Sequence, residues 1–367
     1  MRTVAEHLAA CLEIARPAAP LDVVLLDAVG CVLAESVVAD LDLPAVDLAG
    51  LDGYAVMSAD LAAAAETTPV TLEVMDAVRA GHPDVEFELV TVQTTGDVNM
   101  KPFSEASDPF GIKGLFTQEL EDALLRGELD LAVHSLKDLP MKQDERLPLV
   151  ALSRRGDPRD ALLLPRGADG STVPDDGSGP IGCSSARRRL QLATLFPGRT
   201  VEPVRGNIQT RLRKLDEPDA SGSRPFSMLV LAAAGLRRLG LEGRIDRLLS
   251  PDEMVPAAGQ GILACQGRAG EDYAYLDVVR DRDAEDCAAA ERSFVAALGG
   301  GCALPVAAYA VAEGDILNLS GFYADEVRGI RRTGKLSGPR TEAGSLGREL
   351  AERLRAARWD DGGTEER

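Results

Sequence analysis

A cysteine on a glycine-rich loop is the first residue of this sequence that could carry out covalent chemistry. Cys302 follows three consecutive glycines and precedes Ala303-Leu304-Pro305. Glycine lifts the steric limits on backbone approach, so a bulky group could reach a thiol held there. Most free cysteines are instead small buried hydrophobic side chains, and the local sequence alone favours that interpretation. The other chemically reactive residues of the sequence decide between a reactive loop cysteine and a buried one.

A second candidate is an anion site in a basic segment of an acidic chain. The segment Cys183–Lys214 holds eight Arg or Lys and one acid, a local balance of +7 in 32 residues. Ser185 is placed to cap a helix that opens with Arg187 and Arg188, so backbone N–H groups and guanidinium groups converge on one ligand. Carboxylates or phosphates fit such a site. A solvated basic helix face is the alternative, and RNA binding is disfavoured because Phe196 is the only aromatic residue there.

Two further pairs of charged residues extend this chemistry. Arg205 and Arg211 flank a Gly-Asn turn, and arginine suits planar, bidentate recognition of carboxylates. Lys137 and Asp138 follow a predicted strand, and strand exits carry ligands in open α/β sheets. A cation beside a carboxylate is therefore a candidate for acid–base or electrostatic chemistry, with a surface ion pair or a turn aspartate as the alternative.

The elements that must position these residues form alternating α/β units. Periodicity predicts helices over 117–126, 185–195 and 207–215, and strands at Ile181 and over 85–92, 129–135, 200–204 and 226–232. From Cys287 onward it predicts a helix, strands over 306–312 and 316–322, and a terminal amphipathic helix over 345–357. The pattern indicates three small domains.

Composition narrows the class of protein. The formal charge of 40 − 59 = −19 argues against a nucleic-acid or anionic-membrane binder, because like charges repel. The sequence has no apolar stretch of membrane-spanning length and no signal-peptide pattern, so we expect a cytoplasmic protein. Its six cysteines form no Cys-x-x-Cys pair and it has three histidines, so we expect reduced thiols and no metal site.

Seven segments, in order along the chain from about Pro83 to Ala357, resemble the hydroxymethylbilane synthase (porphobilinogen deaminase) family. They are Lys113-Gly-Leu-Phe-Thr-Gln-Glu-Leu-Glu, Asp130-Leu-Ala-Val-His-Ser-Leu-Lys-Asp-Leu-Pro, Gly182-Cys-Ser-Ser-Ala-Arg-Arg, Val204-Arg-Gly-Asn-Ile-Gln-Thr-Arg-Leu, Ala233-Ala-Gly-Leu-Arg-Arg-Leu-Gly-Leu, Pro256-Ala-Ala-Gly-Gln-Gly and Gly300-Gly-Cys-Ala-Leu-Pro. Seven collinear motifs make the resemblance specific.

The resemblance implies a transferase that joins four porphobilinogen molecules head to tail, loses ammonia at each addition and releases hydroxymethylbilane by hydrolysis. The family's cofactor cysteine, which carries dipyrromethane through a thioether, matches Cys302, and its catalytic carboxylate matches Asp138. A fixed carboxylate stabilises the cation formed when a pyrrole attacks an electron-poor azafulvene. The acetate and propionate arms account for the cations. Matched cofactor-binding residues are Lys113, Lys137, Ser185, Arg187 and Arg188, and matched substrate-binding residues are Phe116, Arg205, Arg211, Arg238 and Gln260.

The family's architecture implies an α/β protein with two periplasmic-binding-protein-like domains around a cleft and a small α+β C-terminal domain. We expect the first domain over 83–158 with about 262–280, the second over 159–261, the third over 284–358 and a tail over 359–367. The expected partners are porphobilinogen and its oligomers, with no nucleic acid and no membrane, and the expected protein is a monomer.

The start of the chain departs from that family. Its usual opening strand and helix, with an Ile-Gly-(Thr/Ser)-Arg-x-Ser motif, do not occur here, and Val70–Met75 is the nearby segment whose alternation could fill the strand position. Residues 1–82 instead resemble the leading segment of molybdopterin molybdenumtransferase, as in Leu25-Leu-Asp-Ala-Val-Gly-Cys-Val-Leu-Ala-Glu and Leu51-Asp-Gly-Tyr-Ala-Val. The pterin-binding domain of that family is not matched. We therefore interpret the chain as an in-frame join near residue 82.

A long loop is a further departure. Lys101–Lys113 is longer than usual, with Pro109 where the family often has a lysine, and its composition predicts a mobile active-site cover.

Two other function classes stay open. A molybdenum cofactor biosynthesis protein built on residues 1–82 would bind pterin and dimerise, whereas a catalytically impaired anion-binding fusion would take up ligand without turnover.

Overall fold

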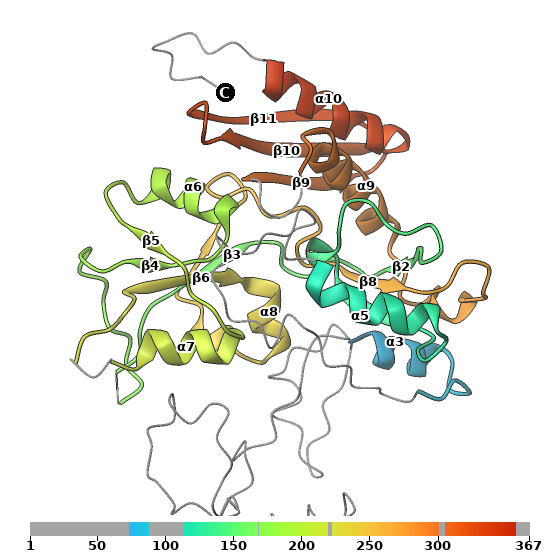
Figure 1. The fold of residues 1–367 in the computed structure, drawn as a ribbon, viewed down its shortest axis with the longest axis horizontal. Helices are drawn as coiled ribbons and strands as arrows, with labels where there is room; N and C mark the ends of the chain where they lie inside the picture. The colour runs from blue at the N-terminus through green and yellow to red at the C-terminus, as the bar shows by residue number, and fades with distance from the viewer. Residues whose placement is uncertain (1–72, 88–113, 168, 219–221, 301–304, 357–367) are drawn as a thin grey trace, which may run out of the picture. The chain divides into compact units, whose positions relative to one another are not determined.

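Three β-sheets with helices on their faces make up the described part of this computed structural model (Figure 1). The structure describes residues 73–87, 114–167, 169–218, 222–300 and 305–356. Cys302, Lys113 and the segment Val70–Leu72 therefore lie outside the described residues. The sheets and their flanking helices confirm the expected mixed α/β class.

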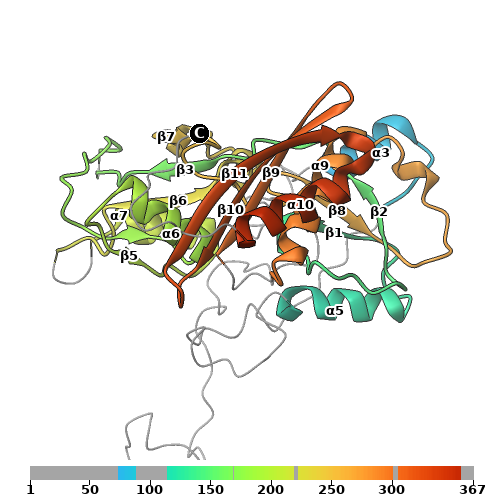
Figure 2. The ribbon, with the colours of Figure 1, turned by 90° about the horizontal axis from the view of Figure 1, so that it is seen from above.

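The first sheet has three antiparallel strands in the order β1-β8-β2. Successive side chains of β1 point to opposite faces of the sheet. Val133 packs with Val74 and Val78 of helix α3 on one face, and Ala132 packs with Leu120 of helix α5 on the other. Figure 2 shows the two helices on opposite sides of these strands. The elements are β1 (Ala132–Ser135), β2 (Leu149–Leu152), β8 (Leu263–Gln266), α3 (Glu73–Gly81) and α5 (Gly114–Leu125).

Near the join, one candidate strand needs correction, and a second lies mostly outside the described residues. Val70–Met75 was the nearby candidate for the missing opening strand, but Glu73, Val74 and Met75 form the first turn of α3. Val74 and Val78 are one helical turn apart and both are buried against the first sheet, so the helical period prevails over the alternating one. The strand expected over 85–92 is described only at 85–87, where the backbone is irregular.

The second sheet has five strands in the order β5-β4-β6-β3-β7. Strands β5, β4 and β6 are parallel, and β3 runs antiparallel to β6 and β7. Helix α6 covers one face through Leu192, and helices α7 and α8 cover the other through Leu215 and Leu236 (Figure 1). The elements are β3 (Asp160–Leu163), β4 (Ile181–Gly182), β5 (Val201–Glu202), β6 (Met228–Ala232), β7 (Arg247–Leu249), α6 (Ala186–Leu195), α7 (Ile208–Asp216) and α8 (Ala233–Arg238).

The third sheet is an antiparallel meander in the order β11-β10-β9, crossed on one face by α9 and α10 (Figures 1 and 2). Gly321 of β10 lies where a Cβ would be 2.7 Å from the ring of Phe294, so glycine lets α9 approach the sheet closely. The elements are β9 (Val306–Glu313), β10 (Ile316–Asp325), β11 (Ile330–Pro339), α9 (Arg282–Ala297) and α10 (Ala343–Ala356).

Most predicted elements of the second and third sheets are confirmed within a few residues. Strand β11 was not predicted, because its outward positions carry Arg331 and Lys335 and its inward positions include Gly334 and Gly338, which leaves little apolar alternation. Four 3-10 turns complete the described structure: η2 (Leu136–Asp138), η3 (Glu242–Arg244), η4 (Ala274–Leu276) and η5 (Arg340–Glu342). Over the described ranges, no helix is long and apolar enough to cross a membrane.

Candidate active site

The turn after β1 presents Asp138 to solvent. Leu136 and Leu139 are fully buried on either side of it, and the amide of Leu136 donates to the carbonyl of Ile262 at 3.0 Å. With both leucines anchored, the 3-10 turn η2 leaves Lys137 half-buried and Asp138 exposed. The predicted strand exit is thus a short turn, anchored by two buried leucines, that places a carboxylate at the surface.

Helix α6 begins as its sequence predicts, with Ser185 as the N-cap. The Ser185 hydroxyl accepts from the amide of Arg188 at 3.4 Å, and the backbone of Ser185 is extended as a cap requires. The neighbouring Ser184 hydroxyl donates to the carbonyl of Val204 at 2.6 Å, which ties this helix start to the loop that carries Arg205. The two basic motifs found in the sequence are therefore adjacent in the fold.

The first two arginines of α6 point into the protein rather than into solvent. Arg187 and Arg188 are 6% and 8% exposed, and both contact Asp160, the fully buried first residue of β3. Arg188 donates from Nε and Nη2 to Oδ1 of Asp160 at 3.0 and 2.8 Å, while Nη2 of Arg187 lies 2.8 Å from Oδ2. Burial alone would raise the pKa of Asp160, but the two guanidinium groups hold it below its ordinary value.

Asp160 was missed by the sequence interpretation. Its neighbours Ala161, Leu162 and Leu163 form a fully buried strand, and no element was predicted at this position from the sequence. The signal that could have identified it is an acid at the start of an apolar run, because a carboxylate in a buried strand requires cationic or hydrogen-bonding partners.

Gln260 joins this buried ion cluster to the turn that carries Asp138. Its side-chain amide donates to Oδ1 of Asp160 at 2.9 Å and to the carbonyl of Pro158 at 2.6 Å, and its Oε1 lies 3.5 Å from Nζ of Lys137. Burial lowers the pKa of Lys137 to about 8, against the opposing attraction of Asp138. The ammonium group is therefore mostly charged at neutral pH and is close to its titration range.

The remaining arginines lie at the rim of the cluster. Nε of Arg211 donates to the carbonyl of Gly206 at 2.6 Å, and none of the described residues pairs with its terminal nitrogens. Arg238 donates to the carbonyl of Gly261 at 3.3 Å, and Arg205 is half-buried on the loop before α7. Burial and nearby Arg188 both lower the pKa of Arg211, as expected for a cation placed beside other cations.

The positive charge gathered around Asp138 could bind the carboxylate groups of a ligand. The charge of Asp138 acts on Lys137, Arg188 and Arg211, so the turn and the basic helix share one electrostatic neighbourhood. Even with Asp138 and Asp160 counted, cations outnumber carboxylates among the described residues of the cluster. Such an excess favours anionic ligands, and the fixed carboxylate of Asp138 provides a place for positive charge that develops during a reaction.

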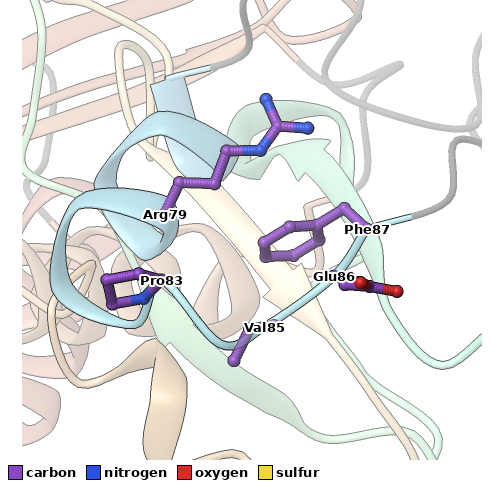
Figure 3. A pocket seen from close by; sticks show the side chains of 5 residues that line it. All are labelled: Arg79, Pro83, Val85, Glu86 and Phe87. Carbon is purple, nitrogen blue, oxygen red and sulfur yellow. The ribbon is translucent and has the colours of Figure 1, made fainter.

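Three predicted site residues are not tested by these contacts. Cys302 and Lys113 lie outside the described residues, and Phe116 lies in α5 with its side chain outside them. A separate hollow of about 520 Å³ is lined by Arg79, Pro83, Val85, Glu86 and Phe87 at the end of α3 (Figure 3). It contains none of the predicted site residues.

Among the described residues, no group of His, Cys, Asp and Glu side chains could hold a metal ion.

Comparison with protein families assigns the site-bearing part of the chain. The family model described as porphobilinogen deaminase, dipyromethane cofactor binding domain, matches residues 63–275, and the porphobilinogen deaminase C-terminal domain matches residues 286–356. The model described as MoeA N-terminal region (domain I and II) matches residues 2–98. The first match begins ahead of Pro83, where the resemblance was expected to start, so the two kinds of segment overlap over 63–98.

Curated proteins named porphobilinogen deaminase match most of the chain. The protein from Acetivibrio thermocellus is 49% identical over 278 residues, which are 76% of this chain and 90% of that protein. The protein from Ruminiclostridium josui is 46% identical over 285 residues, 78% of this chain and 92% of that protein. The protein from Roseiflexus castenholzii is 42% identical over 288 residues, 77% of this chain and 89% of that protein.

Proposed function

This chain belongs to the porphobilinogen deaminase family, and on that premise we propose that it is a hydroxymethylbilane synthase of tetrapyrrole biosynthesis. It joins four porphobilinogen molecules head to tail with loss of ammonia and releases hydroxymethylbilane by hydrolysis. The observation that carries the proposal is the extent of the family match, which spans both the cation cluster around Asp138 and the segment that contains Cys302. A transferase of this kind needs both parts.

The donor set fits the cofactor of this family. Dipyrromethane, attached through a thioether to Cys302, supplies the primer to which substrate units are added. Its carboxylate arms call for guanidinium and ammonium donors, and Lys137, Arg187, Arg188 and the cap residue Ser185 are grouped around one cluster. Lys113 belongs to the same proposed set.

The rim residues suit the incoming substrate. Porphobilinogen carries one acetate and one propionate arm, and the terminal N–H groups of Arg211 have no partner among the described residues. Arg205, Arg238 and Gln260 surround the same neighbourhood and are assigned to substrate binding, with Phe116 beside the pyrrole ring. Positive charge that develops on the substrate as ammonia departs faces the carboxylate of Asp138, which also accepts the pyrrole proton.

The domain organisation follows the same proposal. The first and second sheets belong to two periplasmic-binding-protein-like domains, over 83–158 with about 262–280 and over 159–261, and the third sheet belongs to a C-terminal domain over 284–358. We assign the chain to the cytoplasm as a monomer. Residues 1–82 form a joined segment of the molybdopterin-molybdenumtransferase type, for which the match over 2–98 is the support.

Intact-protein mass together with turnover tests this function. The purified chain is expected to carry one covalent dipyrromethane, and Cys302→Ser is expected to carry none, because a hydroxyl is a far poorer nucleophile than an ionisable thiol. Cys183→Ser is the matched control: Cys183 is a buried thiol whose sulfur accepts from the amide of Ser185, and a serine hydroxyl keeps that contact. Covalent dipyrromethane on the Cys302 variant would overturn the assignment.

Asp138→Asn is the kinetic arm of the same test. The amide keeps the shape of the exposed side chain but removes the charge that faces the cationic intermediate. Loss of a preorganised electrostatic group costs on the order of 3 kcal/mol, so turnover should fall by roughly a hundredfold or more. Near-normal turnover would remove Asp138 from the catalytic assignment.

A further inference from the structure

A carboxylate on helix α9 is completely buried and takes no part in the cluster described above. Glu291 is 0% exposed and accepts from three donors. They are Nη2 of Arg155 at 2.6 Å, the amide of Gly259 at 2.7 Å and the amide of Ala310 at 2.7 Å. Burial raises the pKa of Glu291, and the nearby Arg155 opposes that effect. A carboxylate kept in such a place requires donors that the fold holds in position.

The donors of Glu291 come from three separate stretches of chain. Arg155 belongs to the segment that leaves β2 for the second sheet, Gly259 to the segment that returns from it, and Ala310 to β9. Arg155 also donates to the carbonyl of Gln260 at 3.2 Å. The peptide segment Gly259–Gln260 is therefore held from both ends, by Glu291 at its amide and by Arg155 at its carbonyl.

Gly259 lies directly against the turn that carries Asp138. Its φ of +76° is in the left-handed region, and a Cβ built on it would be 2.7 Å from Cγ of Leu136. The next side chain along the chain, Gln260, contacts both Asp160 and Lys137. A shift of Gly259 would therefore displace the turn on one side and the Gln260 amide on the other.

We propose that Glu291 is a positioning residue of the active site, which holds Gly259 so that Gln260 and the Lys137–Asp138 turn keep their relative placement. This proposal rests on the proposed function for its kinetic consequence. Its structural consequence, the placement of the Gln260 amide, does not depend on that function. Glu291 touches neither cofactor-binding nor substrate-binding side chains directly, and it acts through the peptide between Gly259 and Gln260.

Glu291→Gln is the variant that tests the proposal. One oxygen of Glu291 serves Arg155 and Ala310 and the other serves Gly259, whereas glutamine has one accepting oxygen and an NH2 group. If the oxygen stays with Arg155 and Ala310, the NH2 faces the Gly259 amide and that hydrogen bond is lost. Amide exchange at Gly259 should speed up by at least tenfold while Ala310 is unchanged. The side-chain amide protons of Gln260 should shift in the NMR spectrum.

Kinetics give the second readout. Because Gln260 and Lys137 are assigned to binding carboxylate-bearing ligands, KM for porphobilinogen should rise about tenfold in Glu291→Gln with kcat changed less than threefold. Glu285→Gln, the same substitution at a half-buried position of α9 where Glu285 pairs with Arg280, should change none of these quantities. Glu291→Asp, which keeps the charge on a shorter side chain, should lie between the wild type and Glu291→Gln.

A destabilising control separates positioning from loss of stability. Phe294→Leu leaves a cavity in the core of the C-terminal sheet, since Phe294 is fully buried one turn from Glu291. It should lower the melting temperature without moving the Gln260 signals or KM. Equal effects of Phe294→Leu and Glu291→Gln on those signals, or unchanged Gly259 exchange in Glu291→Gln, would overturn the proposal. Absence of dipyrromethane and of turnover in the wild type would instead refute the proposed function, and the Gln260 signals would still decide the role of Glu291.

Discussion

The arginines of the site fall into two physical classes that their sequence motif does not separate. Arg187 and Arg188 are buried and share Asp160, so much of their charge is balanced inside the protein. Arg211 is at the rim, and its terminal nitrogens have no described partner. We therefore expect the first class to stabilise the site and to contribute positive charge at the proposed cofactor position, and the second to bind a ligand through its terminal N–H groups.

Substitution by leucine should distinguish the two classes. Arg187→Leu leaves buried Asp160 with one guanidinium fewer and should cost about 3 kcal/mol of stability, as does removal of one partner of a buried pair. Arg211→Leu should change the free energy of unfolding by less than about 1 kcal/mol and mainly raise KM. Urea denaturation and steady-state kinetics on both variants check this. An unchanged unfolding free energy in Arg187→Leu would contradict the role given to Asp160.

Lys137 should impose an alkaline limit on ligand binding. Its pKa is lowered to about 8, so the ammonium is charged below that pH and neutral above it. Binding of carboxylate ligands should weaken as pH rises from 7 to 9.5. In Lys137→Arg, whose side chain stays charged over the whole range, this weakening of binding at alkaline pH should disappear. Titration with porphobilinogen across that range is the measurement, and an identical weakening in both proteins would assign it to another group.

The same shift fixes the sign of the effect of Lys137 on stability. The folded-state pKa is below the ordinary value of 10.5, so between about pH 8 and 10.5 the unfolded chain binds more protons at this site. The contribution of Lys137 to the free energy of unfolding therefore increases with pH through that window. Burial of the charged form of Lys137 therefore lowers the free energy of unfolding near neutral pH.

At the scale of elements, the C-terminal sheet depends on a close crossing of α9 and α10. Gly347 of α10 lies where a Cβ would overlap the carbonyl of Ala290 and come within 2.8 Å of the amide of Phe294. Gly344, one turn earlier, would meet only the far ends of the Ser293 and Arg348 side chains, at 3.3 and 3.4 Å. Of these two glycines, packing requires only Gly347.

Gly347→Ala should therefore destabilise the protein while Gly344→Ala should not. Backbone overlap in a packed crossing costs about 1–3 kcal/mol. Alanine at Gly344 should be neutral or stabilising by about 0.5–1 kcal/mol, since it reduces the freedom of the unfolded chain. Thermal denaturation of the two variants is the comparison. A stabilised Gly347→Ala would mean that the helices can separate without loss.

At the scale of the whole molecule, we expect the first sheet to be the part that an exchange of the chain's opening segment affects. Strand β1 pairs with β8 on one side, and within the described ranges no strand pairs with its other side. An unpaired strand edge leaves backbone donors and acceptors to water. Helix α3 packs against this sheet, so its residues belong with the sheet in any exchange of the opening segment.

Replacing residues 1–72 with a family-type opening strand that carries the missing arginine, while keeping α3, should raise turnover. It should also increase amide protection in β1, because a neighbouring strand would pair with the side that none of the described strands occupies. Turnover and hydrogen exchange on the two chains are the measurements. Equal rates and equal protection would show that the usual opening strand is dispensable and that the interpretation of the join is mistaken.

Local patterns determined much of this protein. The cap at Ser185, the helices α6 and α7 and the strands β9 and β10 follow from signals a few residues long, and the structure confirms them. The cysteine, the carboxylate and the basic helix were also recognisable, because each motif is continuous in the sequence.

Tertiary structure alone decided how those motifs are connected. Asp160 contacts Gln260, which lies 100 positions away in the sequence. Glu291 accepts hydrogen bonds from three separate chain segments whose spacing follows no helical or strand period. The first turn of α3 belonged to a candidate strand because Val70, Leu72 and Val74 alternate in sequence. Burial of Val74 and Val78 against the sheet favours the helix instead. How strongly the protein itself holds each arginine depends on its buried contacts, such as those of Arg187 and Arg188 with Asp160. These contacts join residues far apart in the chain, so no local sequence pattern indicates them.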